Sequence, residues 1–236
     1  MNPTILEMID SFENNNMIEL EKKIKAYFTK EYSLIPLQKL IELEAVVVPK
    51  PIITKNFNGI NGLWYIQNYL SRNEIETIKN YINNETNLEP ISNKNKSRRV
   101  AHFGYYYSYD RTGLKEAPPI PLDLKKLASV ERINKLINLD INSFDQVIIN
   151  EYNPGQQIAY HTDHTKLFGP VISCITIGQS VPIYFRLGSE EKELLIEEGS
   201  MYIMTEDARY KWQHSLKNNS TGTRYSITYR TINQKN

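Results

Sequence analysis

The sequence predicts a mainly β (α+β) fold, a sandwich or barrel of short strands with flanking helices, preceded by a short helical extension. The strands are predicted after Asn142, where segments alternate apolar and polar residues or are rich in β-branched and aromatic side chains. Turn signals separate these segments at 153–155, 169–170, 188, 198–199 and 218–222. Many short strands at this spacing are typical of sandwiches and barrels.

The flanking helices are predicted from a start signal and an apolar period. Ser71 stands three residues before Glu74, and an apolar repeat at 3- and 4-residue steps begins at Ile75. This order is typical of a capping box at the start of an amphipathic helix. The remaining pattern predicts a strand over 63–66, a loop over 83–97 and a second helical segment over 123–139.

The first 50 residues predict a helical N-terminal extension. Apolar residues recur at helical steps in two stripes, from Ile5 to Phe12 and from Met17 to Phe28. Such stripes need to be covered, and two interpretations stay open: packing against the main domain, or binding of a protein partner. The prolines in VVVPKP at 46–51 predict an extended linker, because each disfavours helix at the residue before it.

Composition restricts the class of protein. The 28 Lys and Arg nearly balance the 27 Asp and Glu, so a basic surface for nucleic acid has to be local. The single cysteine excludes an internal disulfide and a Cys-based zinc cluster. Because we find neither a leader peptide nor an apolar run of about 20 residues, we expect no membrane association and an intracellular protein, cytoplasmic or nuclear.

Two histidines and an aspartate are candidate metal ligands. His161 and Asp163 are two residues apart at a predicted strand end, so both side chains point to one face. His214 follows 53 residues after His161, beside another strand-like segment. Two His and one carboxylate on one side of a metal suit non-heme Fe(II) and leave coordination positions open. For the His-x-Asp pair taken alone, a purely structural role stays open.

An alternating segment near the C-terminus predicts an anion site. Its polar face carries two arginines and two hydroxyls: Arg224, Ser226, Thr228 and Arg230. Burying two guanidiniums without an anion is costly, and arginine pairs bidentately with carboxylates, so a dicarboxylate would resolve the cost. Asn150 and Tyr152 share the face of another predicted strand and offer polar groups to the same ligand. The alternative is a solvated sheet face.

In order and spacing these motifs resemble the AlkB-type Fe(II)/2-oxoglutarate dioxygenases. The resemblance covers residues 56–232 and rests on Asn150-x-Tyr152-x-Pro154-Gly155, His161-x-Asp163, His214 and the alternating segment that starts at Arg224. It extends to RRVAHFGY at 98–105 and ARYKWQH at 208–214. Both segments are similar to eukaryotic homologues, especially the branch that hydroxylates a modified wobble uridine in tRNA.

The resemblance implies a double-stranded β-helix (jelly-roll) core and a set of roles. It assigns His161, Asp163 and His214 to Fe(II), with no acid–base residue beyond the metal centre. It assigns Arg224, with Tyr152, to the distal carboxylate of 2-oxoglutarate, and Arg230 and Asn150 to the metal-side end; Ser226 and Thr228 lie on the same face. The implied reaction uses O2, converts 2-oxoglutarate to succinate and CO2, and hydroxylates a C–H bond, with loss of an aldehyde where that carbon is attached to nitrogen.

Two departures from the family pattern affect the assignment. Ser226 replaces the usual Asn between the two arginines, which weakens one co-substrate contact. Thr165 stands where base-repairing relatives often carry an acidic group over the flipped base, which argues against direct repair of DNA.

A basic stretch followed by aromatics predicts a nucleic-acid surface. Four positive charges lie within 94–99, and aromatic residues follow from Phe103 onward. Phosphate contacts and stacking faces of this kind serve single-stranded or flipped nucleotides. The alternative is a solvated loop before an ordinary Tyr-rich strand. The candidate substrate residues are Arg98, Arg99, Phe103, Tyr105, Tyr107 and Thr165.

The sequence therefore predicts a 2-oxoglutarate-dependent dioxygenase that hydroxylates or dealkylates nucleic acid, with RNA or tRNA favoured over DNA. Two alternatives stay open. One is the same chemistry on a protein side chain, and the other is a catalytically silent jelly roll that serves for interaction.

Overall fold

The computed structural model describes residues 49–233 except 93–96, 108–113 and 140. The described residues from Pro51 onward form one compact unit. The helical extension predicted over 1–50, with its suggested partner surface, lies outside the described residues apart from its last two residues. Within the described part of the chain, no helix is long and apolar enough to cross a membrane.

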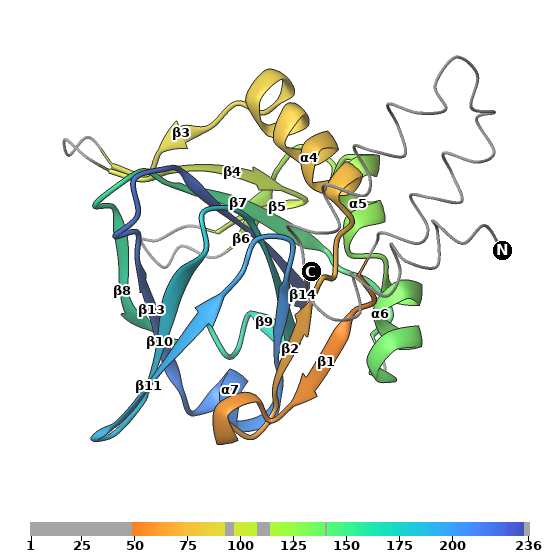
Figure 1. The fold of residues 1–236 in the computed structure, drawn as a ribbon. Helices are drawn as coiled ribbons and strands as arrows, with labels where there is room; N and C mark the ends of the chain where they lie inside the picture. The colour runs from red at the N-terminus through yellow and green to blue at the C-terminus, as the bar shows by residue number, and fades with distance from the viewer. Residues whose placement is uncertain (1–48, 93–96, 108–113, 140, 234–236) are drawn as a thin grey trace, which may run out of the picture. The chain divides into compact units, whose positions relative to one another are not determined.

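The described unit consists of two facing antiparallel sheets, as a jelly roll requires (Figure 1). The large sheet has the order β1-β2-β12-β9-β14-β7-β4-β3, and the small sheet has the order β11-β10-β13-β8. The large sheet is built from β1 (Ile52–Lys55), β2 (Leu63–Gln67), β3 (Glu89–Pro90), β4 (Arg99–Phe103), β7 (Gln146–Tyr152), β9 (Phe168–Gly178), β12 (Met201–Met204) and β14 (Arg224–Ile232). The small sheet is built from β8 (Gln157–His161), β10 (Val181–Leu187), β11 (Glu190–Ile196) and β13 (Gln213–Lys217). The hairpin of β5 (Tyr105–Tyr107) and β6 (Leu114–Glu116) stands apart, and the prediction of a mainly β jelly roll is confirmed.

Helices cover the outer face of the large sheet. They are α4 (Arg72–Glu85), α5 (Leu122–Leu127) and α6 (Val130–Ile137), while η1 (Phe57–Gly59) and α7 (Glu206–Tyr210) are short connections. Figure 1 shows α4, α5 and α6 on one side of the large sheet and the small sheet on the other. One apolar cluster accordingly fills the space between helices and sheet, and a second fills part of the space between the two sheets.

Alternation along β14 determines which residues enter each layer. Ile227 and Tyr229 are completely buried in the cluster under the helices. Their neighbours Ser226, Thr228 and Arg230 point to the other face and line a cavity between the sheets. The polar face and the apolar face predicted for this strand therefore lie in different layers of the fold.

Local signals at the helix starts are partly as predicted. The capping box is present, because the Ser71 hydroxyl accepts from the Glu74 N–H at 3.2 Å and the Glu74 carboxylate accepts from the Ser71 N–H at 2.7 Å. The helical segment predicted over 123–139 consists of two short helices. The chain breaks there into α5 and α6, since the Ser129 hydroxyl accepts from the Arg132 N–H at 3.2 Å and so caps a new helix.

The loop predicted over 83–97 is also only partly correct. Helix α4 continues to Glu85, and the two residues of β3 pair with β4 at the edge of the large sheet.

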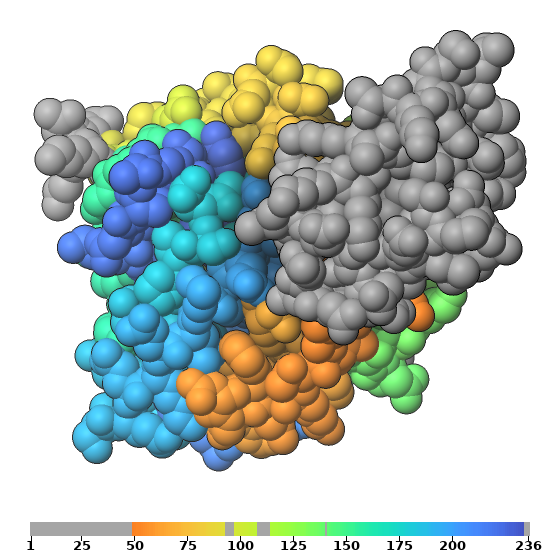
Figure 2. All heavy atoms as spheres, in the orientation of Figure 1, coloured from red at the N-terminus to blue at the C-terminus, as the bar shows by residue number. Residues whose placement is uncertain are grey.

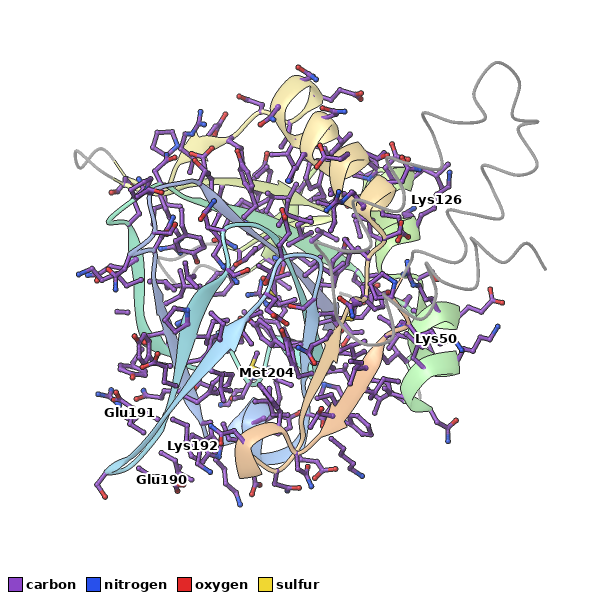
Figure 3. All side chains as sticks on the ribbon, viewed as in Figure 1. Lys50, Lys126, Glu190, Glu191, Lys192 and Met204 are labelled. Atoms are coloured by element: carbon purple, nitrogen blue, oxygen red, sulfur yellow. The ribbon has the colours of Figure 1, made fainter. Side chains whose placement is uncertain are left out.

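The sheets are closed at the end formed by β1, η1 and the β10–β11 hairpin. Lys192 of β11 donates to the Asn58 carbonyl of η1 at 2.9 Å. Figure 2 shows the atoms of the hairpin packed against the segment that contains η1. Figure 3 shows Met204 between the sheets, whereas Glu190 and Glu191 at the hairpin tip point away from the interior.

Candidate active site

A cavity of about 430 Å³ lies between the two sheets and brings the three predicted metal ligands together. His161 ends β8, and His214 on β13 is its direct cross-strand partner. Asp163 follows two residues after His161. One ligand atom from each of the three side chains lies within 4.8 Å of the others.

The imidazole of His161 is oriented by a main-chain carbonyl, and the imidazole of His214 is held without a proton on its second nitrogen. His161 Nδ1 lies 2.9 Å from the Ala159 carbonyl oxygen, which leaves Nε2 for a ligand. His214 Nε2 lies 3.7 Å from Asp163 Oδ2. Burial, reinforced by the nearby His161, lowers the pKa of His214 to about 3, so this ring is held in the unprotonated form that coordinates metals.

Asp163 is held as a carboxylate. Burial alone would raise the pKa of this side chain, but the charge of Arg230 holds it well below its usual range. Arg230 Nη2 donates to Asp163 Oδ1 at 2.5 Å. Two imidazoles and one carboxylate that meet at one end of a cavity are the donor set that suits non-heme Fe(II), so the residues present fit this metal.

Arg230 is fixed on its other sides as well. Its Nη1 donates to Gln146 Oε1 at 3.1 Å, and its guanidinium lies 4.9 Å from the Phe168 ring centre. Its Nε is buried and has no hydrogen-bond partner among the described residues. One donor of this guanidinium is therefore still available to an acceptor.

Arg224 lies deeper than the sequence pattern suggests. It is completely buried and is not among the residues that line the cavity. Its Nη1 donates to the Ser226 hydroxyl and its Nη2 donates to the Thr176 hydroxyl at 2.9 Å. Its Nε is a second buried donor without a partner in the described chain. Two incompletely paired guanidiniums along one strand fit an anionic ligand, because unpaired buried charge is costly.

Asn150 and Tyr152 complete this wall of the cavity. In the sheet Asn150 pairs with Ser226 and Tyr152 pairs with Arg224, so both predicted residues lie beside β14. Asn150 Oδ1 accepts from Arg98 Nε at 3.2 Å, and the Arg98 guanidinium lies 5.9 Å from the Tyr152 ring centre. The predicted co-substrate residues other than Arg224 thus all line the cavity.

The structure separates the two adjacent arginines of the predicted substrate surface. Arg98 lines the cavity. Arg99 projects from the opposite face of β4, where its Nε and Nη2 each donate to a Glu151 carboxylate oxygen at 2.7 Å. Arg99 is therefore an ion-pair residue that lies away from the cavity.

The remaining predicted substrate residues are also divided. Tyr107 lines the cavity with its ring centre 5.6 Å from that of Phe168. Phe103 packs against the cluster under the helices. Tyr105 and Thr165 are not among the lining residues, and Thr165 is exposed in the turn after Asp163.

Several residues of the site were missed by sequence reasoning. Tyr202 and Met204 on β12 line the cavity, and Gln146 positions Arg230. In a strand over 200–205, residues two apart share a face. This period could have placed Tyr202 and Met204 together on the inner face. Arg209 on α7 is 1% exposed and donates to the Asp163 carbonyl oxygen at 2.9 Å; no signal of this contact is present in the sequence.

Comparison with known proteins agrees with this geometry. The family model described as the 2OG-Fe(II) oxygenase superfamily matches residues 62–230. The tRNA (carboxymethyluridine(34)-5-O)-methyltransferase alkbh8 of Xenopus tropicalis is 26% identical over 207 residues, which is 83% of this chain and 32% of that protein. The chain thus spans about a third of the length of this curated relative. The uncharacterized protein L905 of Acanthamoeba polyphaga mimivirus is 26% identical over 195 residues, with 75% of this chain and 88% of that protein covered.

Solved structures share the fold. OsALKBH1 superimposes with a TM-score of 0.55 at 13% identity, covering 72% of this chain and 96% of that one. A Pseudomonas putida prolyl-4-hydroxylase superimposes with a TM-score of 0.52 at 11% identity, covering 74% of this chain and 94% of that one. The chain belongs to the 2OG-Fe(II) oxygenase superfamily and is an AlkB-like 2-oxoglutarate-dependent dioxygenase near the ALKBH8 branch, which implies Fe(II), 2-oxoglutarate and O2.

Proposed function

We propose that the domain over 56–232 hydroxylates or oxidatively dealkylates a nucleic acid, with RNA favoured over DNA. The observation that carries the proposal is the convergence of His161, Asp163 and His214 with Arg230 in one cavity. The three ligands would hold the iron. When bound with 2-oxoglutarate, iron supplies the oxidation, which yields succinate, CO2 and a hydroxylated C–H bond.

In this proposal the two arginines of β14 determine the orientation of the bound 2-oxoglutarate. Arg230 contacts Asp163, so it would bind the metal-side end of 2-oxoglutarate together with Asn150. Arg224 is six residues before Arg230 on the same face of β14, beside Tyr152. It would pair with the distal carboxylate. The buried Nε of each arginine offers a donor that a carboxylate would satisfy.

Two observations support nucleic acid as the substrate class. The names of the curated relatives refer to tRNA for the Xenopus and mouse proteins and to alkylated DNA for the Arabidopsis thaliana protein. Within the cavity, Arg98 offers a cation for phosphate and Tyr107 offers a ring for stacking. Both side chains line the same cavity as the candidate metal ligands His161, Asp163 and His214.

The reaction is tested by succinate release from 2-oxoglutarate with Fe(II), with tRNA, single-stranded RNA, single-stranded DNA and peptides as substrates and with product mass shifts as readout. We expect turnover with RNA and none in the His161→Ala protein. Turnover with a peptide and not with nucleic acid would move the substrate to protein, and no turnover with full metal binding would favour a silent jelly roll.

The nucleic-acid contact is tested by Arg98→Gln, with Arg72→Gln as the control. Both changes remove one positive charge, but Arg72 is exposed at the start of α4. We expect Arg98→Gln to weaken RNA binding and reduce its salt dependence, while Arg72→Gln leaves both unchanged. Equal behaviour of the two variants would remove Arg98 from the substrate surface.

A further inference from the structure

Arg209 is a buried arginine that binds main-chain carbonyls instead of an acid. It is 1% exposed, and its hydrogen bonds in the described part of the chain all go to main-chain carbonyls, although the charge of Asp163 is near enough to interact with it. Its Nε donates to the Gly169 carbonyl at 3.1 Å, and its Nη1 donates to the Asp163 carbonyl at 2.9 Å. Its Nη2 donates to the carbonyls of His164 and Phe168, both at 3.2 Å. Burying a guanidinium whose donors all go to neutral carbonyls is costly, so this arrangement requires an explanation.

The four acceptors are at the two ends of one loop. Asp163 and His164 lie near the start of the connection from β8 to β9, and Phe168 and Gly169 are the first two residues of β9. Arg209 therefore clamps this loop closed at its base. A planar guanidinium with donors in a fixed fork can hold several carbonyls at once, whereas a lysine ammonium is a single point charge on a flexible stem.

The residue also connects two distant parts of the chain. Arg209 is on α7, which leads directly into β13 and His214, while its acceptors include the main chain of Asp163 itself. A second link joins the same two segments, because the Thr162 hydroxyl donates to the Trp212 carbonyl at 3.3 Å. Both links cross between the segments that carry Asp163 and His214.

We propose that Arg209 is a positioning residue that sets the separation of Asp163 and His214 and thereby the affinity of the metal site. The proposal rests on the iron ligands assigned under the proposed function. It is distinct from the role of Arg230, which contacts the carboxylate of Asp163, because Arg209 acts on the main chain of the loop.

The test measures binding of Co(II) to the full chain by its visible absorption, together with unfolding of the metal-free protein. In Arg209→Lys we expect the Kd for Co(II) to rise about 10- to 100-fold, the loss typical when support behind a ligand is removed. Arg132→Lys is the control. Arg132 forms a comparable fork to Glu74 and the Tyr69 carbonyl in the helix layer, so its loss should destabilise the protein without changing the Kd.

Thr162→Val provides a second variant, should Arg209→Lys not fold. It keeps the side-chain shape and removes one link, so the Kd for Co(II) should rise roughly fivefold. A Kd within twofold of the unaltered chain in folded Arg209→Lys, or in Thr162→Val when the lysine variant is unfolded, overturns the proposal. Absence of stoichiometric Co(II) binding in the unaltered chain would instead refute the proposed ligand set.

Discussion

Replacing Arg99 by Gln should destabilise the protein and leave nucleic-acid binding unchanged. The Glu151 side chain is only 3% exposed, and Arg99 supplies both of its charge-assisted hydrogen bonds. Removing one partner of a fully buried pair costs about 3–5 kcal/mol. The Arg99 side chain is 49% exposed, and Glu151 keeps a bond from Asn153 Nδ2 at 3.0 Å. Water can therefore reach the vacated position, and we reduce the expected cost to about 2 kcal/mol.

The assay is urea and thermal unfolding of the unaltered chain, Arg99→Gln, Glu151→Gln and the double variant. For a unit of this size, 2 kcal/mol lowers the melting temperature by roughly 4–8 °C. The double variant should recover part of the loss, because no buried charge is left unpaired. If Arg99→Gln keeps full stability and weakens RNA binding as strongly as Arg98→Gln, the ion-pair interpretation is refuted.

Three further predictions concern the cavity. Arg224→Met should raise the 2-oxoglutarate concentration needed for half-maximal succinate release at least tenfold and leave the Kd for Co(II) unchanged. Arg230→Met should weaken the binding of both 2-oxoglutarate and Co(II). An unchanged 2-oxoglutarate requirement in Arg224→Met would show that Arg224 does not bind the co-substrate. Saturation with Co(II) at about 100 times its Kd should stabilise the chain by about 2.7 kcal/mol in thermal unfolding, and equal stabilisation of Asp163→Ala would contradict the ligand set. Burial, with the charge of Arg230, lowers the pKa of His102 to about 4; because the folded state then binds fewer protons than the unfolded state, stability should fall by roughly 2 kcal/mol as pH drops from about 6.5 to 4. Identical pH slopes in the unaltered chain and in His102→Asn would contradict this last prediction.

The faces of the strands were largely predictable from the sequence. Period-two alternation placed Ser226, Thr228 and Arg230 on one face of β14, and the structure has them lining the cavity. Alternation does not report depth, however. The Arg224 guanidinium is held behind the cavity wall by the hydroxyls of Ser226 and Thr176, and the second of these comes from β9, which is distant in the sequence.

The separation of Arg98 from Arg99 shows a different kind of failure. The segment before Arg99 reads as a basic loop, and in a loop neighbouring side chains have no fixed relation. Once Arg99 begins β4 in register with Glu151, its neighbour must point to the other face. The rule that successive strand residues point to opposite faces was known. The sequence did not show that a strand begins at Arg99, so the rule could not be applied.

The contact between Asp163 and Arg230 is the point at which the two sheets of the site meet. The proposed metal ligands belong to β8, its following loop and β13, while Arg230 comes from β14 of the large sheet. Arg230 donates to Asp163 at 2.5 Å and faces the proposed co-substrate slot. A carboxylate that binds Arg230 must share its donors with Asp163, and this changes the charge that the metal ligand presents. Because such coupling is reciprocal, 2-oxoglutarate should change the Kd for Co(II) by the same factor by which Co(II) changes the Kd for 2-oxoglutarate. Titrations of each in the presence of the other should give equal factors, and in Arg230→Met the factor should decrease; an unaltered factor in that variant would show that the coupling does not pass through Arg230.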